Sequence, residues 1–592
     1  MRTLIFLILA GLVSLSFSAC SNQSVHLPTP KESKAELKLK TLYENAWSWS
    51  QREDGKLLSE SGTWDSGDQW PRVDEDTQLS RLRYWENTLA ELAEIPRGDL
   101  DREGQINAAV FEQIAQSLAS DLHYKTYQAP LNSDTFFWIG LHPRSSGFSD
   151  LAAYERYLNR LADVPRFLLE HETSMRAGIV RGYTVPQVAL TGREDSIEAY
   201  LEDGKRNPFW VPLKHLPQTI SPAEQEHLRE QTLGLISNSI VPAYKQLLAF
   251  MRSEYIPAAR TTIAAKALPD GDAFYRSQIR AYTTLELTPK EIYETGLDEV
   301  ARIRKAQESI LEELEFTGTM REFFAFLRTD PQFYARTPEE LMGVSAYVAK
   351  RMDGKLSEVL GFLPRRRFAI NPVPPEIAPT YTSGRGGLNA CLMNTYNLPA
   401  RPLYAIPALT LHECAPGHAL QAAIALEAPG EIPEFRANNY FSGYGEGWGL
   451  YTEWLGGEIG IYRTPYERFG QLTFEMWRAC RLVIDTGLHQ FGWTRQQAID
   501  YLSEHAALSA HDIETEIDRY ISWPGQALSY KLGEMLIRDK REKAERVLGA
   551  KFDQRYFHDM ILSLRSVPLS VLAAELDAWI NAAGPNPYAQ TP

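Results

Sequence analysis

The chain has 592 residues, of which 44% are hydrophobic and 23% charged, an ordinary globular composition with ample material for a large core. Its formal net charge of −15 argues against nucleic acid or anionic lipid as a partner. After the first twenty residues, no stretch is apolar enough to span a bilayer as a helix. We therefore expect a large globular protein whose only membrane attachment is at its N-terminus.

The N-terminus reads as an export signal. A positively charged start precedes an apolar stretch that is too short to span a bilayer, and Phe17-Ser18-Ala19-Cys20 resembles a lipobox. We expect residues 1–19 to be a lipoprotein signal peptide and Cys20 to carry a lipid. Ser21 favours the outer membrane of a Gram-negative cell, with the protein facing the periplasm. The alternative is an ordinary signal peptide in which the Cys is accidental.

The mature chain is predicted to have three parts. Residues 20–36 are rich in Ser, Pro and Lys and are expected to be a flexible tether. Pro269-Asp270-Gly271 is a turn signal near the middle of the chain. We use it to divide a helical N-terminal half, 37–268, from a catalytic C-terminal half, 269–592. The alternative is one continuous helical body with a deep central cleft.

Local signals predict a mainly α protein. Four segments begin with Ser or Thr, then Pro, then Glu at the third helical position, and a fifth has a capping box without the Pro. The five predicted N-caps are Ser221, Thr288, Thr337, Thr464 and Thr494. Strand signals are few, and the best are 387–395 and 368–373. We expect these two strands to form a small sheet beside the site described next.

Two imidazoles and a carboxylate fall within seven residues, in the stretch from His412 through Glu413 to His418, inside an apolar run. Neutral imidazoles bind Zn²⁺, and an adjacent Glu can take a proton from the attacking water, as in the HExxH signature. Here the second His is six residues on, about 240° round a regular helix. Pro416 and Gly417 can interrupt the helix, so we expect a bulge that brings the two rings together.

A second acidic motif supplies the remaining ligand. Glu446 lies 28 residues after His418, and we expect it to complete a tetrahedral zinc site with one open position. Glu453 is predicted either to orient a ligand from outside the coordination shell or to be a solvated helix residue. The alternative for the whole set is a buried polar network without a metal, which would be costly.

These motifs resemble the DUF885 family of bacterial proteins, which is similar in its core motifs to HExxH-type (gluzincin) oligopeptidases and carboxypeptidases. The matching stretches are HE-x-x-PGH, EGW-x-LY-x-E, 481–489, 516–520 and 524–531. The resemblance implies a large helical oligopeptidase-like body with a central cleft. The family usually has two histidines after Pro-Gly, whereas Ala419 follows His418 here, which supports His418 as the ligand.

Two downstream stretches offer further candidates. Arg481, Asp485 and His489 share one helix face, either as a surface ion-pair ladder or with His489 near the oxyanion and Asp485 orienting it. Tyr530 follows Pro-Gly-Gln, where related peptidases carry a tyrosine that donates to the tetrahedral intermediate; Tyr520 competes for this role. Four basic residues could pair a substrate carboxylate, although a structural role is favoured for each: Lys531, Arg519, Arg481 and Arg385.

Other histidines and the cysteines have simpler interpretations. His171-Glu172 is read as a surface helix pair, and His505 and His511 as surface residues. Cys414 beside His412 is not favoured as a thiol nucleophile, because it faces another way on a helix. For Cys391, Cys414 and Cys480 we expect three buried thiols, with one bridge such as Cys391–Cys414 as the alternative.

The sequence therefore predicts a zinc-dependent peptidase that hydrolyses short peptides in the periplasm. His412, His418 and Glu446 would hold Zn²⁺, Glu413 would act as the base, and Tyr530 with His489 would stabilise the oxyanion. The strand at 387–395 would align an extended peptide by backbone pairing. Two alternatives stay open, a non-catalytic lipoprotein that binds peptides or a partner, and a metal hydrolase of non-peptide amides.

Overall fold

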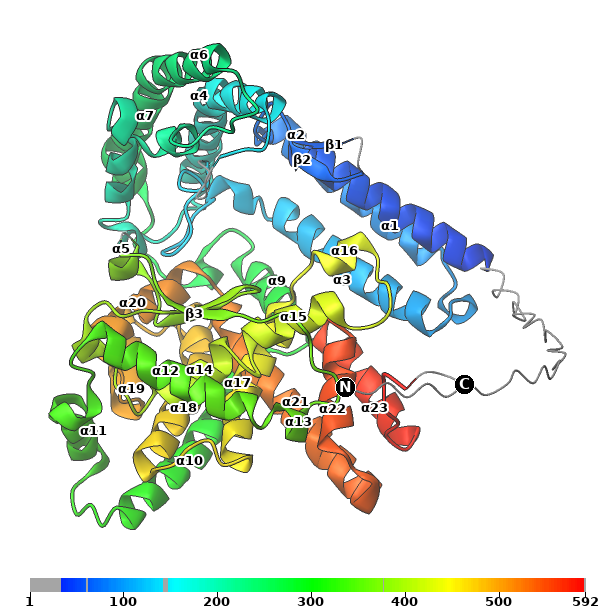
Figure 1. Ribbon diagram of the computed structural model, residues 1–592, viewed down its shortest axis with the longest axis vertical. Helices are drawn as coiled ribbons and strands as arrows, with labels where there is room; N and C mark the ends of the chain where they lie inside the picture. The colour runs from blue at the N-terminus through cyan, green and yellow to red at the C-terminus, as the bar shows by residue number, and fades with distance from the viewer. Residues whose placement is uncertain (1–32, 60–61, 142–146, 376, 590–592) are drawn as a thin grey trace, which may run out of the picture.

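The computed structural model describes residues 33–59, 62–141, 147–375 and 377–589 (Figure 1). The predicted signal peptide and Cys20 lie outside these residues. Helix α1 (Lys34–Glu53) begins with a capping box between Ser33 and Glu36. Residues 34–36, which we expected in the tether, therefore form the first turn of a helix.

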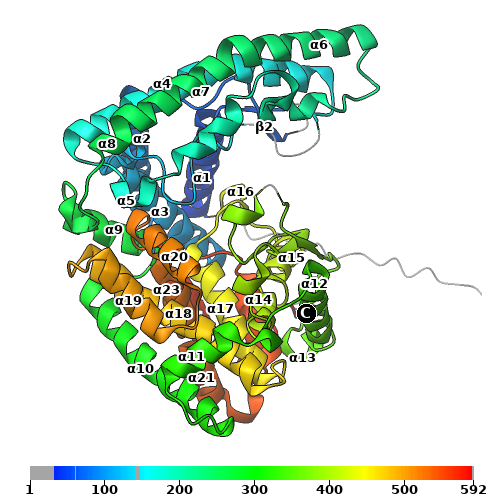
Figure 2. The ribbon, with the colours of Figure 1, turned by 90° about the vertical axis from the view of Figure 1, so that its left-hand side faces the viewer.

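Helices dominate the N-terminal half. A two-stranded antiparallel ribbon, β1 (Lys56–Leu58) with β2 (Trp64–Ser66), separates the first two helices. Figure 2 shows α4, α6 and α7 as a layer above the body that holds the C-terminal helices. The helices after α1 are α2 (Glu75–Ala93), α3 (Arg102–His123), α4 (Leu151–Arg181), α5 (Gln187–Leu190), α6 (Pro222–Leu235), α7 (Val241–Phe250) and α8 (Ile256–Ala258).

Helices also make up most of the C-terminal half, so the predicted mainly α class is confirmed. They are α9 (Gly271–Thr283), α10 (Pro289–Glu313), α11 (Met320–Thr329), α12 (Pro338–Asp353), α13 (Leu356–Val359), α14 (Ile406–Glu413), α15 (His418–Glu427), α16 (Glu434–Ala437), α17 (Ser442–Glu458), α18 (Pro465–His489), α19 (Arg495–His505), α20 (Ala510–Ser522), α21 (Ser529–Leu548), α22 (Gln554–Ser563) and α23 (Leu569–Asn581).

All five predicted helix starts are confirmed. The hydroxyl of each predicted N-cap accepts a hydrogen bond from the backbone N–H three residues on, at the start of α6, α10, α12, α18 and α19. This bond satisfies one of the donors that a helix N-terminus leaves without a partner.

Both predicted strands form, within a three-stranded sheet. The order is β3 (Ala369–Pro372), β5 (Ala390–Met393), β4 (Gly384–Gly386), with β5 parallel to β3 and antiparallel to β4. The sheet lies against α14, as expected. The expectation that the 387–395 strand pairs with a peptide is wrong, because both edges of β5 are already taken. The edge toward the site belongs to β4.

Two large apolar cores hold the molecule together. One joins α1 and α3 to α17, α22 and α23, and the other joins α4 and α7 to α18, α19 and α20. Each core contains side chains from before and after residues 269–271, and the division at that turn stays a prediction. No helix among the described residues is long and apolar enough to cross a membrane.

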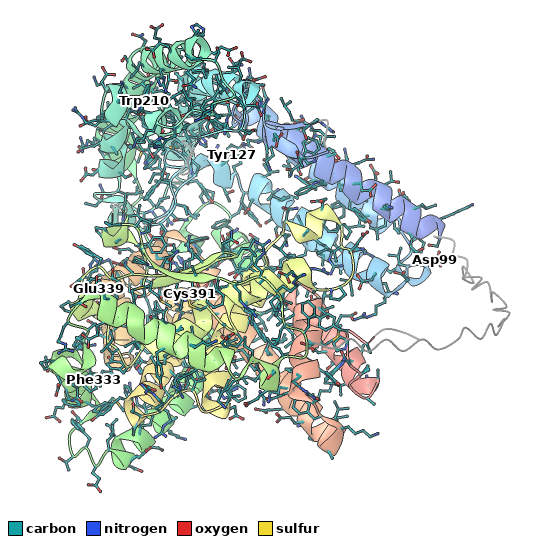
Figure 3. The ribbon with its side chains drawn as sticks, in the orientation of Figure 1. Asp99, Tyr127, Trp210, Phe333, Glu339 and Cys391 are labelled. Carbon is teal, nitrogen blue, oxygen red and sulfur yellow. A yellow bond between two sulfur atoms is a disulfide. The ribbon has the colours of Figure 1, made fainter. Side chains whose placement is uncertain are left out.

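One disulfide links the sheet to the end of α14. Cys391 of β5 is bonded to Cys414, which directly follows α14, while Cys480 is a buried free thiol (Cys391 is labelled in Figure 3). The expectation of three buried thiols is therefore wrong, and the alternative pairing is the one present. The bridge ties the residue after Glu413 to the central strand.

Candidate metal centre and cleft

The helix that carries His412 is interrupted before His418. Helix α14 ends at Glu413, the Ala415–Pro416 peptide is cis, and α15 begins at His418. The indole N–H of Trp448, on α17, donates to the Pro416 carbonyl at 2.9 Å. The two imidazole rings consequently lie 4.9 Å apart, centroid to centroid. The predicted bulge is present.

Both imidazoles face the same carboxylate. Oε2 of Glu446 lies 3.4 Å from Nε2 of His412 and 3.3 Å from Nε2 of His418. One potential ligand atom from each of the three residues lies within 4.8 Å of the other two. Three separate helices, α14, α15 and α17, thus direct two nitrogens and one oxygen to a common point.

The far side of each ring is held by another side chain. Nδ1 of His412 lies 2.7 Å from Oε1 of Glu453, and Nδ1 of His418 lies 3.3 Å from Oε1 of Gln421. When Nδ1 donates to these oxygens, Nε2 of a neutral ring keeps a lone pair for a metal. Glu453 is fully buried, so the predicted alternative of a solvated helix residue is wrong.

The electrostatics of the cluster favour a cation. Burial alone would lower the pKa of His412, but hydrogen bonds to Glu446 and Glu453 raise it to about 10. The pKa of His418 is also raised, because Glu446 outweighs burial. Although burial opposes it, the two imidazoles hold the pKa of Glu446 well below its usual range. Each imidazole has a hydrogen-bond partner on its far side, and the carboxylate faces both rings. Two imidazoles and one carboxylate are a donor set that fits zinc.

Close backbone approaches explain the glycines around the cluster. A Cβ on Gly449, one turn after Glu446 on α17, would lie 2.7 Å from the His412 ring. A Cβ on Gly386 would overlap the Glu413 carbonyl and lie 2.6 Å from Cβ of His418. Only glycine leaves room for the ring and for the sheet at these two positions.

Glu413 faces strand β4 and does not join the three-residue cluster. Its Oε2 accepts a hydrogen bond from the backbone N–H of Gly386 at 2.6 Å. The β4–β5 pairing uses the backbone of alternate residues, with Gly387 N–H donating to Ala390 and Asn394 N–H donating to Ser383. The intervening backbone groups of Gly386 therefore point away from β5, toward Glu413.

The cluster opens into a cleft of about 1220 Å³. His412, Glu413, His418 and Glu446 line it together with β4, and residues 134–136, 139 and 140 of the N-terminal half contribute to its wall. Tyr530 also lines the cleft, 6.4 Å from the His412 ring centroid to centroid. The candidate metal ligands thus face a space bounded by both halves of the chain.

Tyr530, rather than Tyr520, faces this cleft. The hydroxyl of Tyr530 accepts a hydrogen bond from Arg519 at 3.4 Å. The Tyr520 hydroxyl is buried and engaged with Trp477, Arg481 and Glu516, each at 2.8 Å. Tyr520 does not line the cleft and serves a buried network.

His489 and Asp485 do not take the places we expected. Nδ1 of His489 accepts from the Ala265 backbone N–H at 3.0 Å, and Nε2 donates to the Tyr520 carbonyl at 2.9 Å. Burial lowers the pKa of His489 to about 3. Asp485 accepts from the Tyr275 hydroxyl and from the Gly525 backbone instead. The proposal of His489 beside the oxyanion is therefore wrong, and the face that it shares with Asp485 is buried.

Other basic and histidine candidates are also settled by their contacts. Lys531 is fully buried among three glutamates and does not line the cleft, whereas Arg385 is an exposed residue of β4 at its wall. The reading of His171-Glu172 as a surface pair is wrong, because both are buried on α4 and His171 stacks on Phe137. His511 is exposed and His505 half-buried.

Sequence reasoning missed Tyr440, a second phenol at the centre. Its hydroxyl packs against Gly445, and its side chain lines the cleft beside Glu446. Although Tyr440 is 56% exposed, desolvation of its hydroxyl and the carboxylates of Glu446 and Glu413 nearby raise its pKa above the usual range. No motif surrounds this residue, and its only sequence signal is a position six residues before Glu446.

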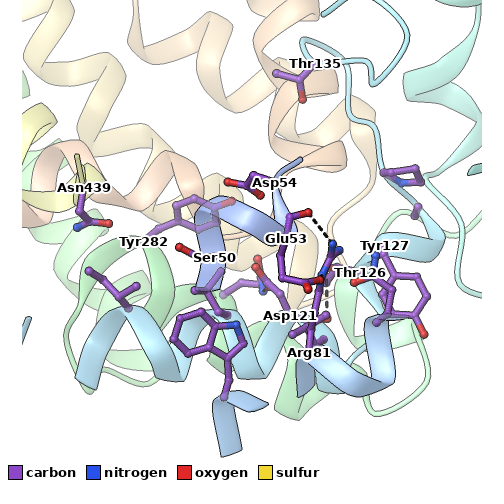
Figure 4. Close-up of a pocket in the computed structure, with 18 of the residues that line it drawn as sticks. Ser50, Glu53, Asp54, Arg81, Asp121, Thr126, Tyr127, Thr135, Tyr282 and Asn439 are labelled. Carbon is purple, nitrogen blue, oxygen red and sulfur yellow. Dashed lines mark hydrogen bonds and ion pairs between the residues drawn. The ribbon is translucent and has the colours of Figure 1, made fainter. Parts of the chain in front are cut away.

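An acidic cavity of about 720 Å³ adjoins the cleft (Figure 4). The two spaces share Tyr282 and Asn439 in their walls. Asp54 and Asp121 line the acidic cavity, and burial raises the pKa of Asp121 to about 6. The combined space is therefore acidic at this end.

The chain resembles known proteins across most of its length. It matches "the putative lipoprotein from Colwellia psychrerythraea" with a TM-score of 0.84 and 26% identity over 93% of this chain and 99% of that one. It shares the fold of "a putative lipoprotein of unknown function from Shewanella oneidensis", with a TM-score of 0.64 and 17% identity over 92% and 99%. No curated protein matches. The model of DUF885, described as a bacterial protein of unknown function, matches residues 57–576, and the chain therefore belongs to this family.

Proposed function

We propose that the protein is a zinc-dependent peptidase of the gluzincin type, acting on short peptides. One observation carries the proposal, the convergence of both Nε2 atoms on Oε2 of Glu446 with Glu413 beside them in the cleft wall. This donor set leaves one side open to substrate, as catalytic zinc sites require. When bound, zinc polarises the scissile carbonyl and lowers the pKa of a water molecule.

The side chains around the cluster divide the remaining chemistry. Glu413 takes the proton of the attacking water and passes it to the leaving amine. Tyr530 donates its hydroxyl hydrogen to the substrate oxygen that gains negative charge. Because Arg519 donates to the Tyr530 oxygen, the phenol's own hydrogen is left to point at the substrate. Tyr440 is a second phenol at the same end of the cleft.

Strand β4 is the element that we expect to align the substrate. It is an edge strand on the wall of the cleft, and because the Gly386 N–H is bonded to Glu413, a peptide would pair with its other outward-facing backbone groups. An extended peptide can add to such an edge through main-chain hydrogen bonds. This places the peptide backbone beside Glu413.

We also propose that the protein is a periplasm-facing lipoprotein, anchored to the outer membrane through Cys20. The similar structures are described as putative lipoproteins. The disulfide between Cys391 and Cys414 supports export, since such bonds persist in oxidising compartments. Labelled palmitate on the wild type but not on Cys20→Ser would support the anchor, and an unlabelled wild type would refute it.

Metal analysis of the purified full-length protein tests the proposed chemistry, together with a digest of a peptide library. We expect about one zinc per chain, lost in His412→Ala, His418→Ala and Glu446→Ala, and cleavage of library peptides. Unchanged metal content in all three variants would remove the site from consideration. Stoichiometric zinc without cleavage of any peptide would favour a peptide-binding lipoprotein.

A further inference from the structure

We propose that three arginines beside Tyr530 bind the C-terminal carboxylate of the substrate, so that the enzyme releases one to three residues from a free C-terminus. This inference rests on the proposed peptidase function and names its substrate class. The three residues are Arg478 and Arg481 on α18 and Arg519 on α20, and all line the cleft.

Each of the three guanidinium groups keeps a buried N–H without a hydrogen-bond partner among the described residues. The atoms are Nε of Arg478, Nη1 of Arg481 and Nε of Arg519. Arg478 and Arg481 are only 5% and 2% exposed, so solvent does not readily serve these donors. Native structures leave few buried donors unpaired, and these three surround one aromatic ring at the wall of the cleft.

Three carboxylates lie within 4.0 Å of the three arginines, but only one of them is within hydrogen-bond distance. Glu516 is hydrogen-bonded within the group, 2.9 Å from Arg481 and 3.4 Å from Arg519. Glu453 lies 3.8 Å from Arg478 but is already engaged with His412. Asp134 lies 3.6 Å from Nε of Arg519, beyond hydrogen-bond distance, and its side chain is 42% exposed. The arginines therefore keep N–H groups that a substrate carboxylate can bond.

The charge of the cleft also decides where an anion can go. The adjoining cavity carries Glu53, Asp54 and Asp121 against one basic residue, Arg81, so its net charge disfavours a carboxylate. The arginine group, in contrast, can offer planar guanidinium donors that match a carboxylate in geometry.

The arginine group is close enough to the metal centre to limit what lies beyond the scissile bond. Cζ of Arg481 is 4.4 Å from the Tyr530 ring centroid, which is 6.4 Å from the His412 ring centroid. Cζ of Arg481 and the His412 ring centroid are therefore at most about 11 Å apart. An extended residue spans about 3.5 Å. One to three residues therefore separate the scissile carbonyl from the bound carboxylate.

A set of three matched peptides tests the inference on the zinc-loaded full-length protein. The first is the best library peptide with a free C-terminus, the second is its C-terminal amide, and the third is the amide with Glu as the last residue. We expect kcat/KM for the free acid to exceed that of both amides on the order of 10²-fold, the scale of one lost buried charge pair. Mass spectrometry should show C-terminal fragments of one to three residues.

The outcomes separate this inference from the proposed function. Equal cleavage of the free acid and the first amide leaves the peptidase intact and overturns the carboxylate subsite. Cleavage of the third peptide as fast as the free acid assigns the arginines to an acidic side chain and overturns the C-terminal assignment. If no library peptide is cleaved by the zinc-loaded protein, the proposed function fails, and the inference fails with it.

Arginine variants provide the second test, read as the ratio of kcat/KM for the free acid to that for the amide. Arg478→Gln and Arg519→Gln should each lower this ratio by at least about tenfold. The ratio cancels general damage, because both peptides meet the same variant. Arg495→Gln is the control, since Arg495 pairs with Asp518 next to Arg519 but does not line the cleft. A ratio unchanged in both cleft variants would overturn the inference.

Discussion

Glu453 holds the His412 ring from behind, with Oε1 2.7 Å from Nδ1, although the two residues come from different helices. Glu453 is wholly buried and His412 is 2% exposed, so the pair is shielded from water. Glu446, one of the three candidate ligands, is on the same helix as Glu453, two turns earlier. Helix α17 thus supplies both a candidate ligand and the residue that holds the ring of another candidate ligand.

The first prediction follows from this pair. Glu453→Gln keeps the size of the side chain but removes its charge, so His412 loses its ionic partner. Zinc affinity should fall by about 10–100-fold, the usual effect of altering a residue that orients a metal ligand. Competition with a chromophoric chelator measures this. Glu458→Gln, at an exposed position of α17, is the control, and equal affinities in the two variants would contradict the assigned role.

A second prediction concerns the space that Gly449 leaves for the ring. A Cβ at Gly449 would stand 2.7 Å from His412, whereas a Cβ at Gly457 on the same helix would meet no atom within 4 Å. Gly449→Ala should therefore displace the ring and weaken zinc retention by at least about tenfold. Gly457→Ala should retain zinc like the wild type. If both variants hold zinc normally, the ring does not need its observed position.

The third prediction separates the chemistry from metal binding. Glu413 accepts from the Gly386 N–H and lies outside the three-residue cluster, and a Gln can keep that hydrogen bond. Glu413→Gln should keep its zinc while kcat/KM falls by a factor on the order of 10²–10⁴, as for a removed general base. Zinc and activity are measured on the same sample. Loss of zinc would instead make Glu413 a ligand.

Some of this architecture could be predicted because its causes are local. A Thr followed by Pro and then Glu begins α10 whatever the rest of the chain does, since the cap involves only neighbouring residues. The break between His412 and His418 has the same character, because Pro416 and Gly417 lie within it. The candidate zinc ligands themselves were proposed from spacing, and the structure brings them together.

Other features depend on partners that lie far away in the sequence. Arg481, Asp485 and His489 share a helix face, but spacing does not say what packs on that face. The ring of His489 binds the backbone of Ala265, 224 residues away, which removes it from the cleft. Tyr440 was missed for the same reason, because its place beside Glu446 depends on how a loop folds back.

A fourth prediction distinguishes the two tyrosines. Tyr530→Phe removes a hydroxyl that faces the cleft and should lower kcat with zinc unchanged, because its bond forms in the transition state. Tyr520→Phe removes the centre of a buried network with Trp477, Arg481 and Glu516. It should cost about 1–3 kcal/mol in the free energy of unfolding. If Tyr520→Phe lowered kcat and Tyr530→Phe lowered the free energy of unfolding in denaturant, the two roles would be exchanged.

The last prediction concerns pH and Asp121, at the wall of the acidic cavity. Burial raises its pKa from 3.8 to about 6, although Gln278 donates a hydrogen bond to it. A raised carboxyl pKa means that the folded protein binds this proton more tightly than the unfolded chain does. The cost of ionising Asp121 is therefore absent below about pH 4 and grows until about pH 6–7, above which it is constant.

Asp121→Asn removes that cost while keeping the side chain's acceptor. It should raise the free energy of unfolding by about 1–3 kcal/mol at pH 8 and by almost nothing at pH 4. Denaturant titrations at both pH values measure the difference, with the exposed Asp539→Asn as the control. A gain of the same size at pH 4 would show that the effect does not come from the ionisation of Asp121.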